Sequence, residues 1–405
     1  MLVPLTNTPR DYAWGSTDLI ARLEGREPTG RPEAEVWLGD HPGNPAITAD
    51  GRTLDAWLAE EGGAVGAPAK LTFLMKLLAA GSPLSIQAHP SKEQAEAGFA
   101  REERAGIPRD AGHRTYRDDN HKPELIVAVS DEFLALAGLR ALADTRRLLA
   151  LLGPTGAVLS ARLDDADAEA SLSAVIAWLL SGGAQDEVDA LIRAAGDAPR
   201  GAGFDAELEL VAHLARAYPS DPGVIVAMLM NLVSLAPGEG LYVPAGVLHA
   251  YVAGLGVELM AASDNVLRGG LTPKHIDVGE LVSVLTPSPG PAPRVEAEEV
   301  GEGLWRYPTP APDFTLRRAD VAAHTPVRVP VSDTAILLAT TGAVTVSSAG
   351  DDLALTPGRA VLVTPDAEGA VLRGAGTVFI ASTGFIASTG FIASTGLAAP
   401  NGSAA

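Results

Sequence analysis

The hydrophobic periodicity of the chain changes twice, and these two changes limit the folds that it can adopt. From about residue 139 to 234, segments such as "LRALADTRRLLALLG" and "ELELVAHLARAYPS" carry apolar residues at helical spacing and end at Gly or Pro. On either side, short apolar runs are broken every few residues by Pro, Gly or Asp, which is typical of strands and turns. We therefore expect helices inserted between two halves of one β domain.

A second β-rich region follows the proline-rich segment "TPSPGPAP", whose alternating prolines predict a stiff linker. The predicted fold class is mainly β with an inserted α-helical domain. The expected divisions are residues 1–138 and 235–285 for the main β domain, 139–234 for the helical domain, 286–293 for the linker, 294–396 for a smaller β domain and 397–405 for a tail.

Two stretches, "LAPGEGLYVPAGVLHAYVAG" and "LTPGRAVLVTPDAEGAVLRG", align without gaps. Gly238 of the first matches Gly358 of the second, and both stretches predict a turn, a strand, a turn and a strand. Gly369 stands where the first stretch has His249, so only the first carries an imidazole. Chance similarity between turn sequences is the alternative explanation.

The end of the chain repeats "FIASTG" three times, from Phe379 to Gly396. The first copy predicts a final strand. The other copies combine strand-forming residues with little charge, and we interpret them as a tandem duplication without a function.

The composition excludes several classes of partner. A net charge of -20 and a pI near 4.7 repel nucleic acids and acidic membranes. The absence of cysteine leaves only nitrogen and oxygen ligands for a metal. The start of the chain lacks the pattern of a signal peptide, and no apolar run reaches about 18 residues. We therefore expect a soluble, cytoplasmic protein.

The segment "SIQAHPSKEQ" places Gln87 and His89 two positions apart in an apolar run. Residues two apart on a strand point to the same side, so both polar groups would face one space. Ser91 and Gln94 fit a capping box for the helix that follows. A buried, hydrogen-bonded histidine without a ligand is the alternative for this pair alone.

The segment "DDNHKPELIVAV" brings a carboxylate into an apolar strand. Pro123 disfavours helix at Lys122, and Glu124 begins the strand "ELIVAV". A buried glutamate is costly unless a cation or metal compensates its charge. A solvated glutamate at the end of the strand is the alternative.

The segment "GEGLYVPAGVLHAY" has the spacing G-x5-P-x-G-x2-H, which resembles the second cupin motif. Pro244 and Gly246 predict a tight turn, after which His249 starts a strand with Tyr251 on the same side. Ala253 stands where cupins usually have Asn, and the H-x-H of their first motif is replaced by Gln87 and His89. A glutamine, two histidines and a glutamate suit Zn²⁺, while Mn²⁺, Co²⁺ and Fe²⁺ remain open.

Four segments together resemble the type I mannose-6-phosphate isomerases: "PLSIQAHPSK", "DDNHKPELIVAV", "VPAGVLHAY" and "SDNVLRGGLTPKHID". The resemblance spans about residues 1 to 285 and, more loosely, the rest. It implies a cupin jelly roll with an inserted helical domain and a second cupin-like domain. It also implies one zinc ion per chain bound by Gln87, His89, Glu124 and His249, and a catalytic role for Arg268.

Other residues of these segments are candidates for binding the substrate. Cations in so acidic a protein are suited to an anionic sugar phosphate. The candidates for substrate binding are Lys76, Lys274, Asp264, Tyr251 and Glu258, of which Asp264 and Glu258 could instead orient neighbouring groups. Histidines without such a setting are expected to be structural or on the surface: His41, His113, His213, His275 and His324.

The implied reaction interconverts D-mannose 6-phosphate and D-fructose 6-phosphate through an enediol. Lys122 and His121 are both candidates for moving the proton, and the sequence does not choose between them. The alternatives are another cupin sugar-phosphate isomerase or epimerase, and a non-catalytic metal-bound sugar sensor. We expect a monomer whose partner is the small-molecule substrate.

Overall fold

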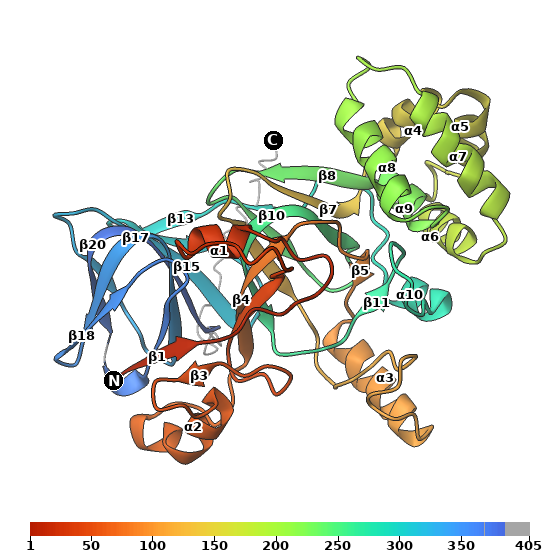
Figure 1. Cartoon of the computed structure of the whole chain (residues 1–405). Helices are drawn as coiled ribbons and strands as arrows, with labels where there is room; N and C mark the ends of the chain where they lie inside the picture. The colour runs from red at the N-terminus through yellow and green to blue at the C-terminus, as the bar shows by residue number, and fades with distance from the viewer. Residues whose placement is uncertain (368, 385–405) are drawn as a thin grey trace, which may run out of the picture.

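The computed structural model describes residues 1–367 and 369–384, and it contains two antiparallel β-sheets with a group of helices at one side (Figure 1). Each sheet has ten strands within these residues. One of them contains the strands of the three sequence motifs and is called the site sheet. The other consists mostly of C-terminal strands and is called the C-terminal sheet. Among the helices described, none combines the length and the apolar character needed to cross a membrane.

The site sheet is organised around one long strand, β10 (His249–Ala261). Its other strands are β2 (Glu35–Leu38), β4 (Phe73–Ala80), β5 (Gln87–Ala88), β6 (Glu124–Ala128), β7 (Phe133–Leu139), β8 (Met230–Leu235), β9 (Gly240–Val243), β11 (Leu267–Arg268) and β12 (Arg294–Val295). The first half of β10 pairs with β5 and β7, whereas the second half pairs with β4 and β6. One strand thereby joins both parts of the sheet.

The change of partners along β10 occurs at a bulge and a glycine. The register with β7 shifts between Tyr251 and Ala253. Gly254 has a φ of +117°, and a Cβ there would lie 2.7 Å from the carbonyl oxygen of Glu132. Because a side chain would clash and the positive φ favours glycine, this position allows β10 to bend close to β7.

The C-terminal sheet also includes strands from the start of the chain. Its members are β1 (Leu2–Thr6), β3 (Ile47–Thr48), β13 (Glu298–Gly301), β14 (Leu304–Tyr307), β15 (Phe314–Val321), β16 (Val327–Val329), β17 (Ala335–Ser348), β18 (Asp351–Leu355), β19 (Ala360–Val363) and β20 (Ala370–Thr383). β1 pairs with β19, with Leu5 opposite Ala360. This differs from the expected division, which places residues 1–138 in the main β domain. The five residues of β1 carry no sequence signal that identifies the partner strand.

The two sheets pack face to face through apolar side chains. From the site sheet these include Met75, Leu77, Leu125, Val127, Val257 and Leu259. From the C-terminal sheet they include Phe314, Leu316, Ile336, Leu338, Phe379 and Ala381. A fully buried Leu, Val or Phe contributes about 1.5–3 kcal/mol, so this interface fixes the position of the C-terminal sheet behind the site.

The helical group lies between β7 and β8 in the sequence. It contains α4 (Leu142–Ala150), α5 (Gly153–Ser160), α6 (Ala168–Leu180), α7 (Gln185–Asp197), α8 (Asp205–Ala217) and α9 (Gly223–Leu229). Leu172, Val175, Ile176 and Leu179 give α6 a buried face at helical spacing. The same core includes Ile86 and Ala88, so the helices pack on the outer side of β5. β7 and β8 form an antiparallel pair, so the helices are an insertion between two neighbouring strands of the site sheet.

The two repeated sequence stretches have matching structures. Gly238 and Gly358 both adopt left-handed conformations, with φ of +84° and +83°. β9 and β19 each begin two residues later, and β10 and β20 follow as the long strands. The predicted order of turns and strands is confirmed.

The remaining helices lie around the sheets. They are α1 (Leu19–Leu23), α2 (Leu54–Glu60), α3 (Lys92–Arg104), α10 (Val278–Val284) and the 3-10 helices η1 (Gly62–Val65) and η2 (Pro365–Ala367). The predicted capping box of α3 is confirmed, because Ser91 and Gln94 bond to each other's backbone N–H groups. The first "FIASTG" copy lies at the end of β20 as predicted, whereas the second and third copies and the tail 397–405 lie outside the described residues.

Candidate metal centre

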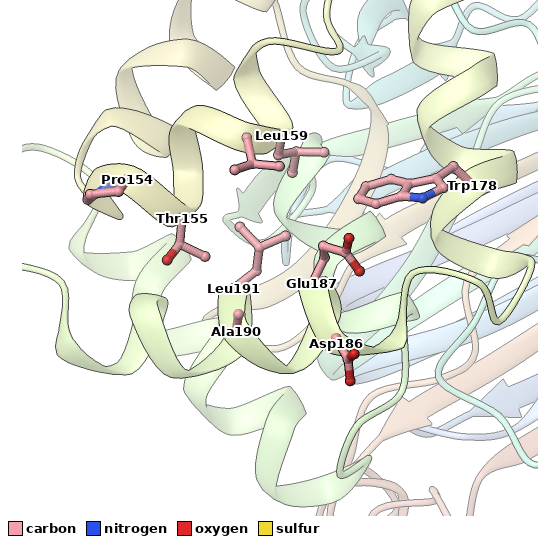
Figure 2. A pocket seen from close by; sticks show the side chains of 9 residues that line it. Pro154, Thr155, Leu159, Trp178, Asp186, Glu187, Ala190 and Leu191 are labelled. Atoms are coloured by element: carbon pink, nitrogen blue, oxygen red, sulfur yellow. The ribbon is translucent and has the colours of Figure 1, made fainter.

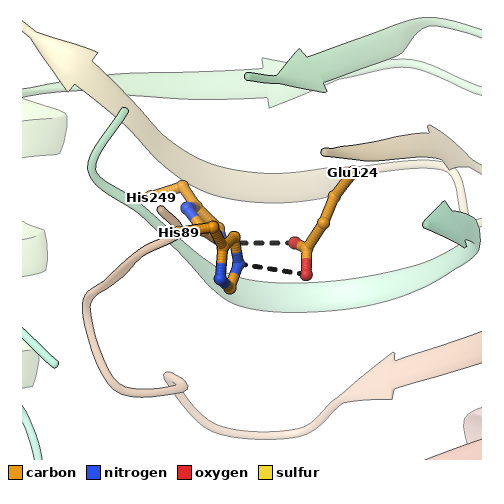
Figure 3. A group of neighbouring side chains, drawn as sticks. All are labelled: His89, Glu124 and His249. Carbon is orange, nitrogen blue, oxygen red and sulfur yellow. Dashed lines mark ion pairs between the residues drawn. The ribbon is translucent and has the colours of Figure 1, made fainter. Parts of the chain in front are cut away.

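Three side chains at the ends of different strands converge on one buried point (Figure 3). His89 follows β5, Glu124 starts β6 and His249 starts β10. The Nε2 atoms of both histidines lie 3.2 Å from Glu124, His89 from Oε1 and His249 from Oε2. All three residues are buried, and their candidate ligand atoms lie within 4.8 Å of one another.

The glycine of the cupin-like turn brings the two histidines together. Gly246 has a φ of +78°, and its N–H donates to the carbonyl of His89 at 2.8 Å. A Cβ at position 246 would lie 2.4 Å from Oγ1 of Thr286. The turn before β10 therefore needs glycine in order to pack against the backbone after β5.

Hydrogen bonds fix the tautomers of the two imidazoles. His89 Nδ1 lies 2.7 Å from the carbonyl oxygen of Asn265, and His249 Nδ1 lies 3.2 Å from that of Val247. A carbonyl oxygen only accepts, so both Nδ1 atoms carry the proton and both Nε2 atoms present a lone pair. This is the outer-shell arrangement that orients metal-binding histidines.

The donor set fits a divalent cation. Two imidazole lone pairs and a carboxylate are all acceptors, so they repel one another unless a cation lies between them. His89 Nε2 is also buried without a hydrogen-bond partner among the described residues. Nitrogen and oxygen donors of this kind suit zinc and other first-row divalent metals.

Burial and neighbouring charges keep these groups ready to bind a metal. Burial lowers the pKa of the His89 imidazole to about 4, although the Glu124 carboxylate opposes this shift. Burial raises the pKa of Glu124, but Lys122 and the two histidines together hold it well below its usual range. At neutral pH, His89 is therefore neutral and Glu124 is ionised.

Gln87 and Arg268 lie on the same face as His249. In the strand order β11-β5-β10, Gln87 pairs with both Arg268 and His249. Side chains of directly paired residues point to the same side of a sheet. The partly exposed Gln87 is thus positioned between the imidazole and the guanidinium.

Lys122 and Tyr251 contact the carboxylate of Glu124. Lys122 Nζ lies 2.9 Å from Oε1, and the Tyr251 hydroxyl donates to Oε2 at 3.4 Å. Both residues are buried. Burial, followed by the charges of Glu124 and Glu258, raises the pKa of Tyr251 well above its usual value. Tyr251 therefore remains a hydrogen-bond donor at neutral pH.

Lys76 and Glu258 form a buried ion pair behind this group. Lys76 Nζ lies 2.9 Å from Glu258 and 3.6 Å from Glu35, and Trp37 Nε1 donates to Glu35 at 2.7 Å. The pair follows from the register, since Lys76 on β4 lies directly opposite Glu258 on β10. No sequence signal marks Glu35, because its partner Lys76 lies on another strand.

A group of cations lies beside the metal centre. Burial, and then the charge of Arg117, lowers the pKa of Arg268. Burial lowers the pKa of Lys274, and Arg268 and Arg117 add to this effect. Within the described residues, none of the three has a carboxylate within ion-pair distance. Unpaired cations in an acidic protein are suited to an anionic ligand. Arg117, an exposed loop residue, had no sequence signal.

Three histidines that were expected to be structural or on the surface lie near candidate site residues. His113 and His275 line a small hollow with Arg268. His41 Nε2 lies 3.3 Å from Asp264, and this hydrogen bond lowers the pKa of Asp264 although burial opposes it. Asp264 is thus paired with an imidazole.

A hollow of about 460 Å³ lies in the helical group, away from these residues (Figure 2). Apolar groups such as Leu159, Trp178 and Leu191 line it, together with Asp186 and Glu187. Its two carboxylates would repel a phosphate. The hollow therefore does not suit an anionic sugar.

The fold and the site define a metalloenzyme-type centre: buried His, Glu and His donors in an antiparallel sheet, next to unpaired cations. Residues 2–142 match the family model "Phosphomannose isomerase type I, catalytic domain". The mannose-6-phosphate isomerase of Escherichia coli is 34% identical, over 92% of this chain and 97% of that protein. The human mannose-6-phosphate isomerase is 33% identical, over 85% of this chain and 88% of that protein.

Solved structures give the same result. Zinc-bound mannose 6-phosphate isomerase superposes with a TM-score of 0.85 at 32% identity, covering 95% of this chain and all of that one. A lysine-to-alanine mutant of phosphomannose isomerase from Salmonella typhimurium has a TM-score of 0.86 at 33% identity, with 95% of this chain covered. The chain belongs to the mannose-6-phosphate isomerase family.

Proposed function

We propose that this chain is a zinc-dependent isomerase that interconverts D-mannose 6-phosphate and D-fructose 6-phosphate. The observation that carries the proposal is the convergence of two Nε2 lone pairs and the Glu124 carboxylate at one buried point. Membership of the family supports the substrate and the reaction. We propose that the enzyme acts as a cytoplasmic monomer on this small molecule.

The proposed architecture is two cupin-like jelly rolls, one from each sheet, with the helical domain of residues 139–234 inserted in the first. The matching turns and strands of the two repeated stretches support it. In this arrangement the second jelly roll has Gly369 in place of His249 and would bind no metal through that position.

Four residues would hold one zinc ion: Gln87, His89, Glu124 and His249. The last three already present their donor atoms, and Gln87 lies across from His249 on the neighbouring strand. A bound zinc ion supplies a Lewis acid that stabilises negative charge on the sugar oxygens. Tyr251, Lys76 and Glu258 support the site from behind, because they contact Glu124 or one another.

The reaction moves one proton from C2 to C1 of the open-chain sugar. When a base removes the proton at C2, the C–H electron pair forms the C1=C2 bond and the carbonyl pair moves to O1. O1 of the resulting enediolate takes up a proton as O2 gives up its own, and C1 takes the proton that was removed from C2, so that O1 becomes a hydroxyl and O2 the ketone oxygen. Arg268, which shares a face with Gln87, would stabilise the negative charge of the intermediate.

Two neighbouring residues are candidates for the proton transfer. Lys122 Nζ lies 2.9 Å from Oε1 of Glu124 and forms an ion pair with it. His121 has one ring nitrogen bonded to a carboxylate, which leaves the other as a possible base. We propose these two residues as the candidates for the proton transfer, of which Lys122 is the one that contacts a candidate metal ligand.

The unpaired cations would bind the phosphate. Burial and then the charge of Arg117 lower the pKa of Arg268, and burial followed by Arg268 and Arg117 lowers the pKa of Lys274. A bound dianion would offset the repulsion between these cations. Asp264 faces His41 and is available to orient a sugar hydroxyl beside them.

A coupled assay of fructose 6-phosphate formation tests the proposal. The purified protein is assayed before chelation, after chelation, and after zinc is returned. We expect the activity to disappear with the metal and to return with zinc. Glu124→Gln is expected to lack activity at every stage, whereas Glu239→Gln, on the surface, should behave like the wild type. Full activity of the chelated protein would refute the metal-dependent reaction.

A further inference from the structure

Asn265 connects the candidate metal centre to the loop that carries one of the neighbouring cations. Its backbone carbonyl accepts the hydrogen bond from His89 Nδ1 at 2.7 Å. Its side-chain oxygen accepts from the backbone N–H of Arg117, also at 2.7 Å. Asn265 is fully buried and lies three residues before Arg268 in the sequence. One residue therefore contacts a candidate metal ligand through its backbone and the loop of Arg117 through its side chain.

The side-chain amide of Asn265 is bonded on both its nitrogen and its oxygen. The nitrogen donates to the carbonyls of Asp118 and Asn120, both at 2.8 Å. The oxygen accepts from the N–H of Asp118 at 3.3 Å in addition to that of Arg117. Only one orientation of the amide is favourable, because reversing it would place donors against donors and acceptors against acceptors. The side chain therefore fixes the backbone of residues 117–120.

The loop has a second attachment to the same segment. The Asp118 carboxylate accepts from the Ser263 hydroxyl at 2.8 Å and from the N–H of Asp264 at 2.7 Å. The bond to the Arg117 N–H differs from these, because the described part of the chain offers this group no second partner. The specific contribution of the Asn265 side chain is thus the position of Arg117.

The residue before Arg117 is also fixed. Tyr116 is buried against Gly98 of α3, where a Cβ would lie 2.4 Å from the tyrosine ring. The Tyr116 N–H donates to Glu102 Oε2 at 2.8 Å. Since Tyr116 is held by α3 and the next N–H is bonded to Asn265, the backbone of Arg117 has little freedom to move.

The position of Arg117 matters because its charge adds to that of Arg268. After burial, the charge of Arg117 is what lowers the pKa of Arg268, so the two guanidinium groups lie within electrostatic reach of each other. A phosphate group accepts charge-assisted hydrogen bonds from several donors at once. A donor that is already held in place loses less conformational entropy on binding, and it therefore contributes more to affinity.

We propose that the Asn265 side chain is a positioning residue that holds Arg117 beside Arg268 and thereby sets the affinity for the phosphate group of the substrate. This assignment rests on the proposed function. Zinc binding is expected to be independent of this side chain, because the carbonyl that orients His89 belongs to the backbone and is present in every variant.

The test compares Asn265→Ala and Arg117→Ala with the wild type, all loaded with zinc. Inorganic phosphate is titrated by isothermal calorimetry, and KM and kcat come from the coupled assay. We expect N265A to weaken phosphate binding and to raise KM about 5- to 10-fold, with kcat and zinc content near the wild-type values. Asn231→Ala is the matched control, because this amide on β8 also donates to two backbone carbonyls, those of Ala137 and Gly290.

A double-mutant cycle shows whether Asn265 acts through Arg117. If it does, adding N265A to R117A should weaken phosphate binding by less than about twofold more. In Asn265→Ser, a water beside the smaller side chain can bond to the Arg117 N–H, so part of the affinity should return. If N265A does not fold, N265S is measured in its place, and we expect it to weaken phosphate binding about two- to threefold.

The outcomes separate this inference from the proposed function. A zinc-loaded wild type that binds phosphate but lacks isomerase activity would refute the proposed function, and the calorimetric comparison would still decide the role of Asn265. Wild-type phosphate affinity in N265A, or an equal loss in the R117A background, would overturn the positioning role. Loss of zinc together with phosphate binding in N265A would also overturn it, because the side chain would then support the whole site rather than Arg117.

Discussion

Lys122 Nζ lies 2.9 Å from the same oxygen of Glu124 that faces His89 at 3.2 Å. One carboxylate oxygen is thus shared between a candidate metal site and a buried ammonium group. Lys122 neutralises part of the charge of Glu124. It therefore changes the electrostatic environment of this candidate ligand without being a ligand itself. Metal binding and the remaining chemistry therefore depend on different residues, and separate substitutions can test them.

Replacing Lys122 by Ala should abolish turnover while the protein keeps its zinc. In the proposed reaction the ammonium group of Lys122 stabilises charge near the sugar, and we expect its removal to lower kcat at least about 100-fold. Zinc per chain, measured by plasma mass spectrometry beside the coupled assay, checks both parts. Lys122→Arg retains the charge and should be less affected. Loss of zinc in K122A would instead show that Lys122 is required for metal binding.

Replacing Glu124 or His249 by Ala should release the metal. Each change removes one of the three converging donors, and a site with fewer ligands binds zinc more weakly. Dialysed variants should contain little zinc, and added zinc should no longer raise their melting temperature. His213→Ala, in the helical group, is the control. Retained zinc with full activity in both variants would contradict the ligand assignment.

Replacing Arg268 by Ala should mainly reduce kcat. Its side chain lies on the face shared by Gln87 and His249, where the proposed mechanism places the developing charge. We expect a loss of about 100-fold or more, with zinc content unchanged. The measurement is steady-state kinetics with metal analysis of the same sample. A variant that changed KM alone would assign Arg268 to substrate binding only.

Replacing Arg117 by Ala should mainly raise KM. The residue belongs to the unpaired cations that we expect around the phosphate, and one charge-assisted contact corresponds to about a tenfold change. Competitive inhibition by inorganic phosphate should weaken by a similar factor. Arg104→Ala removes an exposed cation from α3 and provides the comparison. Equal KM values for R117A and the wild type would exclude Arg117 from this site.

The zinc-free protein should lose stability as the pH falls below about 6.5. The pKa of His89 is about 4 in the folded protein, below its unfolded value of 6.5, so the unfolded state binds more protons between these values. This difference amounts to about 2 kcal/mol between pH 7 and pH 5. Urea unfolding at both pH values measures it. The loss should be smaller by that amount in His89→Gln, and an equal loss would show that His89 does not cause it.

Local sequence signals mark the three residues His89, Glu124 and His249 that the structure brings together as candidate metal ligands. Pro90 ends the strand after His89, Pro123 precedes Glu124, and Gly246 makes the turn before His249, so each ligand has a signal within a few residues. The ligand set itself came from the resemblance to a family. The helical segments and the capping box of α3 could be predicted because their sequence signals also lie within a few residues of each other.

Residues whose role depends on a distant partner could not be predicted. Asp313 meets His121 across 192 positions, and β1 joins the C-terminal sheet through β19. Arg117 is one of many charged loop residues until the fold places it near Arg268. Periodicity identifies a strand or a helix, but the partner of an edge strand or a single charge is decided by tertiary packing.

The pairing of β7 with β8 has a consequence for how the chain could be altered. Leu139 and Met230 are partners in the ladder, so the whole helical group enters and leaves the sheet at points that are only one strand spacing apart, about 5 Å. An unrelated domain whose termini lie equally close could replace the helical group without displacing the strands near the candidate metal ligands. It would also have to cover the outer side of β5. A chimera of this kind that kept its bound zinc would demonstrate the interchangeability of this part of the molecule.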